Sequence, residues 1–501
     1  MSELFLGIDV GTSGLKALAV DRDGKVLGRG LAEYPLHIPM PLWAEQDPDD
    51  WWAAAATAVH AALREVGGGG DVCAVGLTGQ MHGSVFLDAD GRVIRPAILW
   101  CDQRTEAECH EIEERVPNLV QITCNPALTG FTAPKVLWLR NHEPTNYARV
   151  HRVLLPKDFL RYRLTGVAAA EVSDASGTSL FDVPKRTWSG EVLDRLEIPR
   201  EWMAPVAESA EVTARVSSEG ARHIGVPEGT PVVGGGGDQA AGAVGVGTVR
   251  MGIVSTAIGT SGVVFTTLDS PEVDPALSAH TFCHAVPSKW HVMGVMLAAG
   301  GSLRWYRDTF CDAEKKLAVE QGRDPYDLIS EQAATAPTGS EGLIFLPYLT
   351  GERTPHKDPA ARGVFFGVTL SHTRAHFARA VMEGVAFGLR DSYGLLENMG
   401  ASIGEVRASG GGARSDIWLQ ILADVTDRPH VRVAVDEGPA YGAALLAGVG
   451  VSAWPTVEAA CDATVRTSDG FRPNAERHAV YESRYRLFRN LYQDLKARFR
   501  E

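Results

Sequence analysis

Apolar and polar positions form the same local pattern at two places in this chain of 501 residues. The tetrapeptide Gly-Thr-Ser-Gly occurs at 11–14 and again at 259–262, each time between two short apolar runs. The runs cover 4–10, 15–20, 252–258 and 263–267. Apolar runs on either side of a glycine-rich turn predict two strands joined by a tight hairpin. The copies lie 248 positions apart, so we expect one hairpin in each half of the chain.

A helix and a buried strand are predicted after the first hairpin. Asp47 as N-cap, Pro48 at the first helical position and an alanine-rich run through Val66 predict a helix. The apolar run 72–77 that follows predicts a buried strand. This strand places Gln-Met-His-Gly at 80–83 beyond its carboxyl end, where ligand sites of α/β sheets commonly lie.

Helices and strands continue to alternate through both halves. We expect helices near 133–140, after 156, at 239–243, at 373–393 and at 416–424, and strands at 231–233 and 406–408. Glycine clusters at 234–237 and 410–415 each separate a strand from the next helix. The alternation predicts an α/β protein of two domains, 1–247 and 248–501.

Composition and charge narrow the class of protein. The chain is 45% hydrophobic and 22% charged, as expected of a globular protein, and its length favours two domains. The formal net charge of −14 argues against nucleic acid and anionic membrane as partners, because both require clustered Lys and Arg. The sequence leaves a homodimer open.

No targeting or membrane segment is predicted. The residues at 1–5 lack a basic segment followed by a long apolar one, so we expect a cytoplasmic protein. The apolar stretch 439–454 is short and rich in glycine, which favours a buried helix followed by a turn over a membrane span.

The repeated tetrapeptides are candidate phosphate sites. Glycine lets the backbone approach a ligand, while backbone amides and the Thr and Ser hydroxyls donate to phosphate oxygens. The alternative is two ordinary hairpin turns, which explains one copy more easily than two identical copies at half-chain spacing. The P-loop motif Gly-x-x-x-x-Gly-Lys-Ser/Thr is absent.

Two aspartates are candidates for chemistry. Asp238 follows four glycines at a strand-to-helix junction, where it is placed either to meet a substrate hydroxyl or to cap the helix. Asp9 lies inside an apolar strand, and an unpaired buried carboxylate is costly. A water-bridged Mg²⁺ beside phosphates would explain Asp9.

Three other polar residues stand close to these motifs. Gln80 and His82 form a polar cluster after a buried strand, although a histidine in such a place also fits a structural role. Lys16 follows the first tetrapeptide by two positions, where its ammonium either reaches a phosphate or faces solvent.

Five longer segments carry a resemblance to a known family. They read GIDVGTSG at 7–14, QMHG at 80–83, LWCDQR at 99–104, GGGDQAAG at 235–242 and LPYLTGERTPH at 346–356. On these segments the chain resembles the FGGY carbohydrate kinases, from residue 6 to about 448. Two broader family signatures also match, around 130–142 and 363–383. The QMHG segment is the more discriminating one and makes the chain most similar to the D-xylulose kinases of the family.

The resemblance implies a fold and a place for each substrate. The family fold consists of two ribonuclease-H-like domains, of the actin and hexokinase type, that flank a catalytic cleft. The sugar is bound mainly by the first domain and ATP mainly by the second.

The resemblance also implies residue roles. Asp238 is expected to be the catalytic base, and Asp9 the second catalytic carboxylate, which holds Mg²⁺ through water beside the phosphates. The substrate-binding residues expected are Gln80, Met81, His82 and Asp238. The ATP-binding residues expected are Thr12, Ser13, Lys16, Gly259, Thr260, Gly411, Gly412 and Ser415.

The activity implied is transfer of phosphate from ATP to the 5-hydroxyl of D-xylulose, giving D-xylulose 5-phosphate and ADP. One alternative is a kinase for another ketose or a polyol. The other is an actin-like ATPase without sugar kinase activity. Cys101 and the Gly-Gly-Ser at 300–302 depart from the family pattern, but they leave the expected catalytic groups in place.

Overall fold

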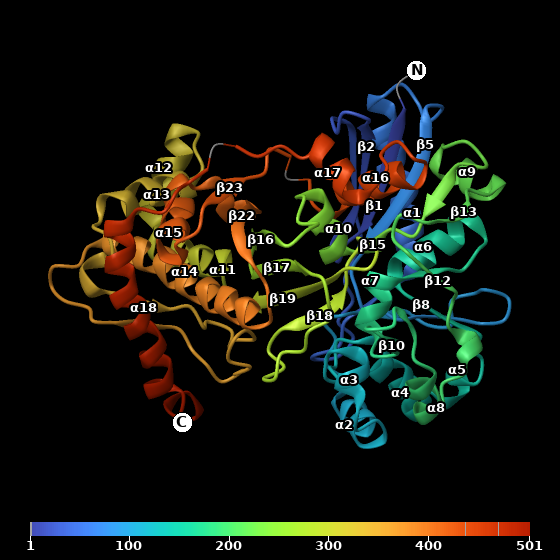
Figure 1. Cartoon of the computed structure of the whole chain (residues 1–501), viewed down its shortest axis with the longest axis horizontal. Coiled ribbons are helices and arrows are strands. Elements are labelled where there is room, and N and C mark those ends of the chain that lie inside the picture. The colour runs from blue at the N-terminus through green and yellow to red at the C-terminus, as the bar shows by residue number, and fades with distance from the viewer. Residues whose placement is uncertain (1–2, 436, 469) are drawn as a thin grey trace.

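Two mixed β-sheets, one in each half of the chain, organise the structure (Figure 1). The computed structural model describes residues 3–435, 437–468 and 470–501. The first sheet runs β13 (Val212–Arg215), β14 (Pro231–Val233), β5 (Val72–Gly79), β1 (Leu4–Val10), β2 (Gly14–Asp21) and β3 (Val26–Glu33), with β15 (Gly236–Gly237) beside β5. The second runs β18 (His280–Cys283), β19 (Trp290–Met296), β17 (Gly262–Leu268), β16 (Gly252–Ile258), β22 (Ile403–Ser409) and β23 (His430–Arg432).

Both predicted hairpins are confirmed, and each lies in the same strand order. The hairpin strands β1 and β2 are antiparallel, as are β16 and β17. In the first sheet β3 pairs antiparallel with β2, while β5 and β14 follow β1 in parallel. In the second sheet β19 pairs antiparallel with β17, while β22 and β23 follow β16 in parallel. The repeat therefore extends to five neighbouring strands, as expected for two ribonuclease-H-like halves.

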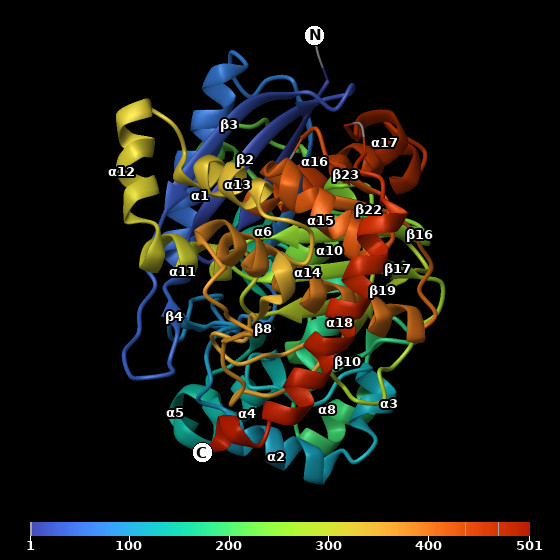
Figure 2. The same cartoon turned by 90° about the vertical axis from the view of Figure 1, so that its left-hand side faces the viewer.

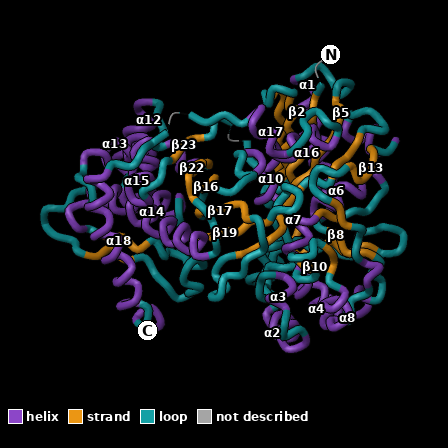
Figure 3. Tube along the Cα trace, in the orientation of Figure 1, coloured by secondary structure: helices purple, strands orange, loops and turns teal. Residues whose placement is uncertain are grey.

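Helices cover the sheets on both faces (Figure 3). Around the first sheet lie α1 (Pro48–Glu65), α6 (Pro156–Thr165), α9 (Ser218–Ile224) and α10 (Asp238–Gly245). An appended region contains α2 (Glu106–Arg115), α3 (Leu119–Thr123), α4 (Thr132–His142) and α8 (Gly190–Leu196). The second half contains α11 (Gly300–Phe310), α12 (Asp312–Gln321), α13 (Pro325–Thr335), α14 (Arg374–Asn398), α15 (Asp416–Thr426) and α18 (Ala475–Leu495). The view in Figure 2 shows α18 along the outer side of the second half.

The predicted start of α1 is confirmed in detail. Asp47 is the N-cap, its side chain accepts the amide of Asp49, and Pro48 occupies the first turn. For α10 the N-cap is Gly237, with no side-chain capping bond, and Asp238 is already inside the helix. Helix capping is therefore not the role in which the structure places Asp238.

Residues near the end of the chain pack on the first sheet. Helix α16 (Pro439–Gly450) lies against β1 and β5, and α17 (Val457–Thr464) packs beside it. Figure 1 shows both red helices next to the blue strands of the N-terminal half. The domain boundary predicted between 247 and 248 stays a prediction. The packing adds a feature that this boundary leaves out, because the chain returns at α16 and α17 to pack on the first half.

Strand β1 separates two cores by its alternating side chains. Leu4, Leu6 and Ile8 pack in the core with α1, whereas Phe5 packs in the core with α16. Gly7 faces α16 as well, because a Cβ on it would lie 1.9 Å from the carbonyl oxygen of Ala440. Successive strand residues point to opposite faces, so both faces of this strand are buried.

The apolar stretch at 439–454 is the buried helix that its composition predicted, and it corresponds to α16. Within the described residues, no helix combines the length and the apolarity that crossing a lipid bilayer requires.

Candidate active site

The strand register gathers the predicted residues at one edge of the first sheet. Asp9 lies opposite Lys16 on β2 and opposite Thr78 on β5, and Thr78 lies opposite Gly236 on β15. Strands β1, β5 and β15 are parallel, so their carboxyl ends meet at this edge. The first tetrapeptide, the 80–83 segment and Asp238 each begin within two residues beyond these ends.

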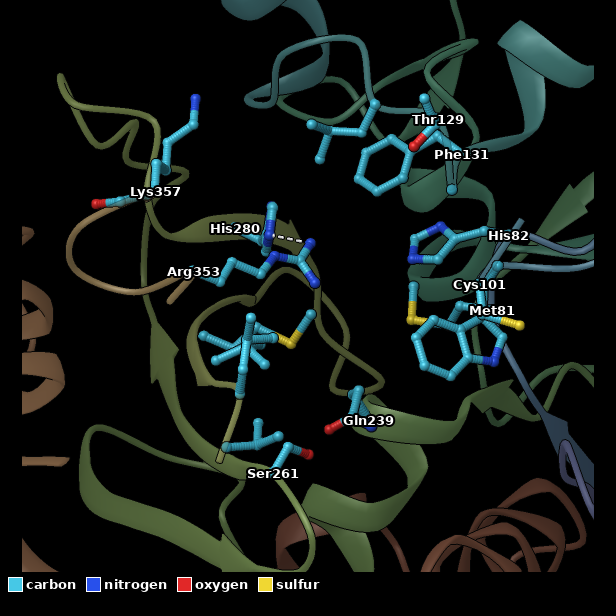
Figure 4. Close-up of a pocket in the computed structure, with 18 of the residues that line it drawn as sticks. Met81, His82, Cys101, Thr129, Phe131, Gln239, Ser261, His280, Arg353 and Lys357 are labelled. Atoms are coloured by element: carbon cyan, nitrogen blue, oxygen red, sulfur yellow. Dashed lines mark hydrogen bonds between the residues drawn. The ribbon is translucent and has the colours of Figure 1, made fainter. Parts of the chain in front are cut away.

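A cavity of about 600 Å³ lies at this edge and is lined by both halves (Figure 4). This volume suits a small-molecule ligand. The first half contributes Met81, His82, Trp100, Cys101, Gln103, Leu128, Thr129, Gly130, Phe131, Asp238 and Gln239. The second half contributes Ser261, Val263, Phe282, Met293, Glu352, Arg353 and Lys357, among others. Three of the four predicted substrate-binding residues, Met81, His82 and Asp238, therefore share one cavity.

The backbone and ring of His82 are held by several partners. His82 has a positive φ of 68°, and its carbonyl oxygen accepts Lys135 Nζ at 2.9 Å and Thr132 Oγ1 at 3.1 Å. Its ring stacks on Phe131 with centroids 4.4 Å apart, and Nδ1 lies 2.7 Å from the carbonyl oxygen of Gly177. A non-glycine residue at positive φ is uncommon and persists where its surroundings hold it.

These contacts define the protonation state of His82. Burial lowers the pKa of the ring to about 3, despite the opposing effect of the hydrogen bond to Gly177. The ring is therefore neutral near pH 7, and Nδ1 carries the proton because a carbonyl oxygen can only accept. Nε2 is left as an acceptor, and the ring faces the cavity in Figure 4.

Asp238 is carried to the cavity wall by a glycine segment packed against β5. A Cβ on Gly235, whose φ is +72°, would lie 1.8 Å from the carbonyl oxygen of Leu77, so only glycine fits there. The amide of Gly237 donates to Ser173 Oγ at 3.0 Å. Burial raises the pKa of Asp238 to about 6, and hydrogen bonds from Gln239 oppose the rise. The carboxylate is thus mostly ionised at neutral pH, yet basic enough to accept a proton.

Asp9 is the unusual carboxylate that its apolar strand indicated. Within the described part of the chain its Oδ1 is buried without a hydrogen-bond partner. Burial and the charge of Asp238 raise the pKa of Asp9 to about 7, while Lys16 opposes the rise. An orphaned carboxylate oxygen beside a second carboxylate fits a divalent cation, because Mg²⁺ prefers oxygen ligands.

Gln80 supports the first tetrapeptide from behind and is not among the residues that line the cavity. Its Oε1 accepts Thr12 Oγ1 at 3.2 Å, and its Nε2 donates to the carbonyl oxygen of Gly11 at 3.2 Å and to Gln46 Oε1 at 2.9 Å. Trp100, which does line the cavity, donates to Thr12 Oγ1 at 2.9 Å. Gln80 thus holds the first tetrapeptide in place through hydrogen bonds, whereas its predicted contact with the sugar stays a prediction.

Lys16 has a partner that the sequence pattern did not indicate. Its Nζ donates to the carbonyl oxygen of Glu437 at 3.0 Å and lies 2.5 Å from Glu437 Oε2. Glu437 also binds Arg29 at 2.7 Å. The ammonium is therefore held by the segment that leads into α16. Ser13, in the first tetrapeptide, is exposed.

A second cavity of about 330 Å³ lies in the second half. It brings together all the predicted ATP-binding residues of that half: Gly259, Thr260, Gly411, Gly412 and Ser415. Register explains their meeting, because Ala257 on β16 lies opposite Ser409 on β22, so both glycine segments leave the sheet side by side. Thr12, Ser13 and Lys16 line neither cavity.

The second tetrapeptide separates the two cavities. Gly259 and Thr260 line the smaller cavity, whereas Ser261 lines the larger one. The loop is anchored by the start of α11, where the amide of Gly300 donates to the carbonyl oxygen of Gly259 at 2.8 Å. The amide of Ala299 donates to the carbonyl oxygen of Thr260 at 2.9 Å. A group held in the smaller cavity therefore lies against a loop that also borders the larger cavity.

Several lining residues were missed by sequence reasoning. Around the larger cavity these include Phe131, Phe282 and Arg353, and around the smaller one Arg304, Asp324, Tyr326 and Trp418. Arg353 lies within the segment at 346–356, so that segment was the available signal. No local pattern marks the aromatic residues as cavity-lining, because an aromatic side chain near apolar residues is equally typical of the core.

Comparison with known proteins agrees with this geometry. The model of the N-terminal domain of the FGGY family of carbohydrate kinases matches residues 4–245, and that of the C-terminal domain matches residues 254–451. The chain is a member of the FGGY family of carbohydrate kinases. It is therefore an enzyme of the kinase class, whose co-substrates are ATP and a sugar, and its resemblance to this family is confirmed.

Relatives are similar over nearly the whole chain. A xylulose kinase from Escherichia coli strain K12 is 42% identical, covering 98% of this chain and 99% of its own. The crystal structure of a xyloylose kinase from Brucella ovis has a TM-score of 0.89 at 37% identity, with 99% of both chains covered. A gluconate kinase from Lactobacillus acidophilus reaches a TM-score of 0.91 at 27% identity, covering 100% of this chain and 99% of its own. The fold is thus shared by kinases named for different sugars, and the residues in the cavity must select the sugar.

Proposed function

We propose that this FGGY kinase transfers the γ-phosphate of ATP to the 5-hydroxyl of D-xylulose, releasing ADP and D-xylulose 5-phosphate. The observation that carries the proposal is the position of Asp238 in a cavity with Met81 and His82, beside the loop that borders the smaller cavity. The relatives named xylulose kinase, similar over nearly the full chain, support the choice of sugar.

Asp238 acts as the general base. Its carboxylate accepts the proton of the sugar hydroxyl while the hydroxyl oxygen attacks the γ-phosphorus in line and ADP leaves. A pKa of about 6 keeps it ionised at neutral pH and gives it proton affinity in the cavity. The neutral ring of His82 accepts a hydrogen bond from another sugar hydroxyl through Nε2, which orients the sugar.

Asp9, with Asp238 nearby, is the group that would hold Mg²⁺ through water. When bound, Mg²⁺ would neutralise the charge of the phosphates. The unpartnered Oδ1 of Asp9 and the raised pKa of this carboxyl support the assignment.

The two tetrapeptides serve the phosphates unequally in this proposal. Gly259 and Thr260, with Gly411, Gly412 and Ser415, hold the nucleotide in the smaller cavity. Thr12, Ser13 and Lys16 reach the terminal phosphate from the first half when the two halves approach each other. Such closure would also exclude water and limit hydrolysis of ATP.

A coupled ADP-release assay across ketoses and polyols with Mg-ATP tests the proposal, with the phosphorylated product identified. We expect D-xylulose to give the largest kcat/KM. A dominant response to ribulose, gluconate or glycerol would overturn the choice of sugar. ATP hydrolysis that no sugar stimulates would favour the actin-like ATPase instead.

Location and assembly complete the proposal. We place the reaction in the cytoplasm, where ATP is available. The homodimer stays a prediction, which light scattering of the purified chain would decide.

A further inference from the structure

Arg353 extends into the larger cavity from the second half, across from His82 (Figure 4). Its Nη2 is hydrogen-bonded to Nε2 of His280. Burial raises the pKa of the neighbouring Glu352 to about 8, so this carboxyl is mostly protonated near pH 7 and does not neutralise Arg353. Glu352 Oε1 accepts the backbone amides of Leu297 at 3.0 Å and of Arg353 at 2.8 Å. Among the described residues the guanidinium has no carboxylate within ion-pair distance. Its remaining N–H groups are therefore available to a ligand.

A chain of hydrogen bonds orients this guanidinium. An arginine can only donate, so His280 Nε2 must accept, and His280 Nδ1 must carry the proton that it shares with Asn125 Oδ1 at 3.0 Å. Burial and the charge of Arg353 hold the pKa of His280 well below its usual range, which keeps the ring neutral. Asn125 in turn donates to the carbonyl oxygen of Thr281 at 2.7 Å. These hydrogen bonds connect the first half to the second and fix the orientation of the Arg353 guanidinium before a ligand binds.

The polar side chains that line the cavity differ in hydrogen-bond type, and some, such as Ser261 and Gln239, can both donate and accept. Asp238 and Nε2 of His82 accept, and both suit hydroxyl groups. Arg353 offers donors alone, and Thr129 Oγ1 already donates to Gln103 Oε1 at 2.6 Å. A donor-only group matches a substrate oxygen that carries no proton of its own, because such an oxygen only accepts, whereas a hydroxyl at the same place also needs an acceptor for its own proton.

An open-chain ketose carries one such oxygen. A ketopentose closes a five-membered ring only through its C5 oxygen, so a molecule whose 5-hydroxyl is free for phosphorylation has a free carbonyl at C2. We propose that Arg353 binds this C2 carbonyl oxygen and thereby selects ketoses over polyols. The inference rests on the proposed function, because it takes the 5-hydroxyl of a ketopentose as the phosphoryl acceptor at Asp238.

The experiment compares D-xylulose with xylitol and D-arabinitol, the two pentitols formed by reduction of its C2 carbonyl. In the Arg353→Gln variant we expect kcat/KM for D-xylulose to fall about 30- to 100-fold, as for a lost charge-assisted hydrogen bond. For the pentitols we expect a change of less than about threefold. Where pentitol turnover is slow, their inhibition constants against D-xylulose replace kcat/KM.

Lys357→Gln is the matched control, because it removes a positive charge at the exposed rim of the same cavity. This variant should leave the ratio of kcat/KM for D-xylulose to kcat/KM for the pentitols unchanged. An equal loss for ketose and pentitols in Arg353→Gln would overturn the inference, because the arginine would then serve the phosphoryl group or the fold. Should Arg353→Gln fail to fold, Arg353→Lys takes its place. We then expect a smaller fall in the ratio of kcat/KM for D-xylulose to that for the pentitols. An unchanged ratio would overturn the inference. Failure of the proposed function is distinct: the unmodified enzyme would then phosphorylate no ketopentose.

Discussion

The two sheets of this kinase share a strand order but differ in what their hairpins carry. Asp9 lies two residues before the first tetrapeptide, and Ala257 lies two residues before the second. The first hairpin therefore brings a carboxylate toward Asp238, and its Oδ1 has no hydrogen-bond partner among the described residues. The second brings backbone and hydroxyl groups to the border of both cavities. The same scaffold thus presents a charged group in one half and a neutral glycine-hydroxyl loop in the other.

The sheets also differ two positions earlier. Gly7 lies opposite Gly76 in the first sheet, whereas Ser255 lies opposite Arg407 in the second. A Cβ on Gly76 would lie 1.9 Å from the carbonyl oxygen of Ala443, so the glycine pair admits α16 directly onto the strands. Arg407 instead donates to the carbonyl oxygen of Val246 at 2.9 Å. At this position the first sheet has glycines that let a helix pack directly on the strands, whereas the second sheet has residues with side chains.

The largest expected effect concerns Asp238, the base proposed for the first half. Asp238→Ala should lower turnover by about three to four decades, because general-base and positioning effects are lost together. ATP binding should be retained, since the cavity proposed for the nucleotide is lined by the second half. Coupled ADP release and calorimetric titration with ATP measure the two quantities, and near-normal turnover would refute the assignment.

Asp9→Asn tests the carboxylate that the second hairpin lacks. We expect turnover to fall about 100-fold, as for the loss of a group that holds charge beside the transferred phosphate. The same change should stabilise the protein without Mg²⁺, because an unpartnered buried carboxylate is replaced by a neutral group.

This stabilisation should depend on pH. The folded-state pKa of Asp9 is raised to about 7, so the folded protein binds its proton more tightly than the unfolded chain does. Stability contributed by that proton is complete below about pH 4 and is lost as the pH rises through 7, a difference on the order of 4 kcal/mol. Thermal melting of both proteins from pH 5 to 8 should show the advantage of Asp9→Asn growing with pH. A constant difference would mean that Asp9 ionises normally.

Gly76→Ala tests the packing of α16. The added methyl would collide with the helix backbone, so we expect a destabilisation of about 3 kcal/mol or more. Gly70→Ala is the control, since a Cβ there meets no atom within 4 Å. Equal melting temperatures for the two variants would show that the helix can shift away from the sheet.

The smallest effect is expected at Lys16. Lys16→Met should raise KM for ATP by about threefold to tenfold, because one partly exposed contact to a phosphate is lost. Glu437→Gln should lower KM for ATP, because it releases the ammonium from its present partner. Changes in the same direction in both variants would show that Lys16 serves the link to α16 and not the nucleotide.

Local elements of this fold could be predicted from the sequence because their causes lie within a few residues. The cap at Asp47, the glycine turns and the alternating apolar runs each act over a short distance, and α1, α10 and both hairpins followed. Much of the site could be predicted as well, since Met81, His82 and Asp238 leave adjacent parallel strands.

Other features depended on contacts between distant segments. Gln80 was expected at the sugar, yet its amide is engaged by Gly11, Thr12 and Gln46, and no local pattern shows where an amide will find its partners. Arg353 lies within the segment at 346–356, but its position in the cavity depends on His280, which is 73 positions away in the chain.

The sequence by itself determined the two hairpins, their phosphate-type turns and the aspartates beside them, because turn chemistry and side-chain alternation are local. Only the tertiary structure decided that α16 returns to the first sheet and that Lys16 pairs with Glu437. It alone also decided that Asn125, His280 and Arg353 form one chain of hydrogen bonds across the two halves. These features require residues up to 421 positions apart to meet, and only the packing of the complete core brings them together.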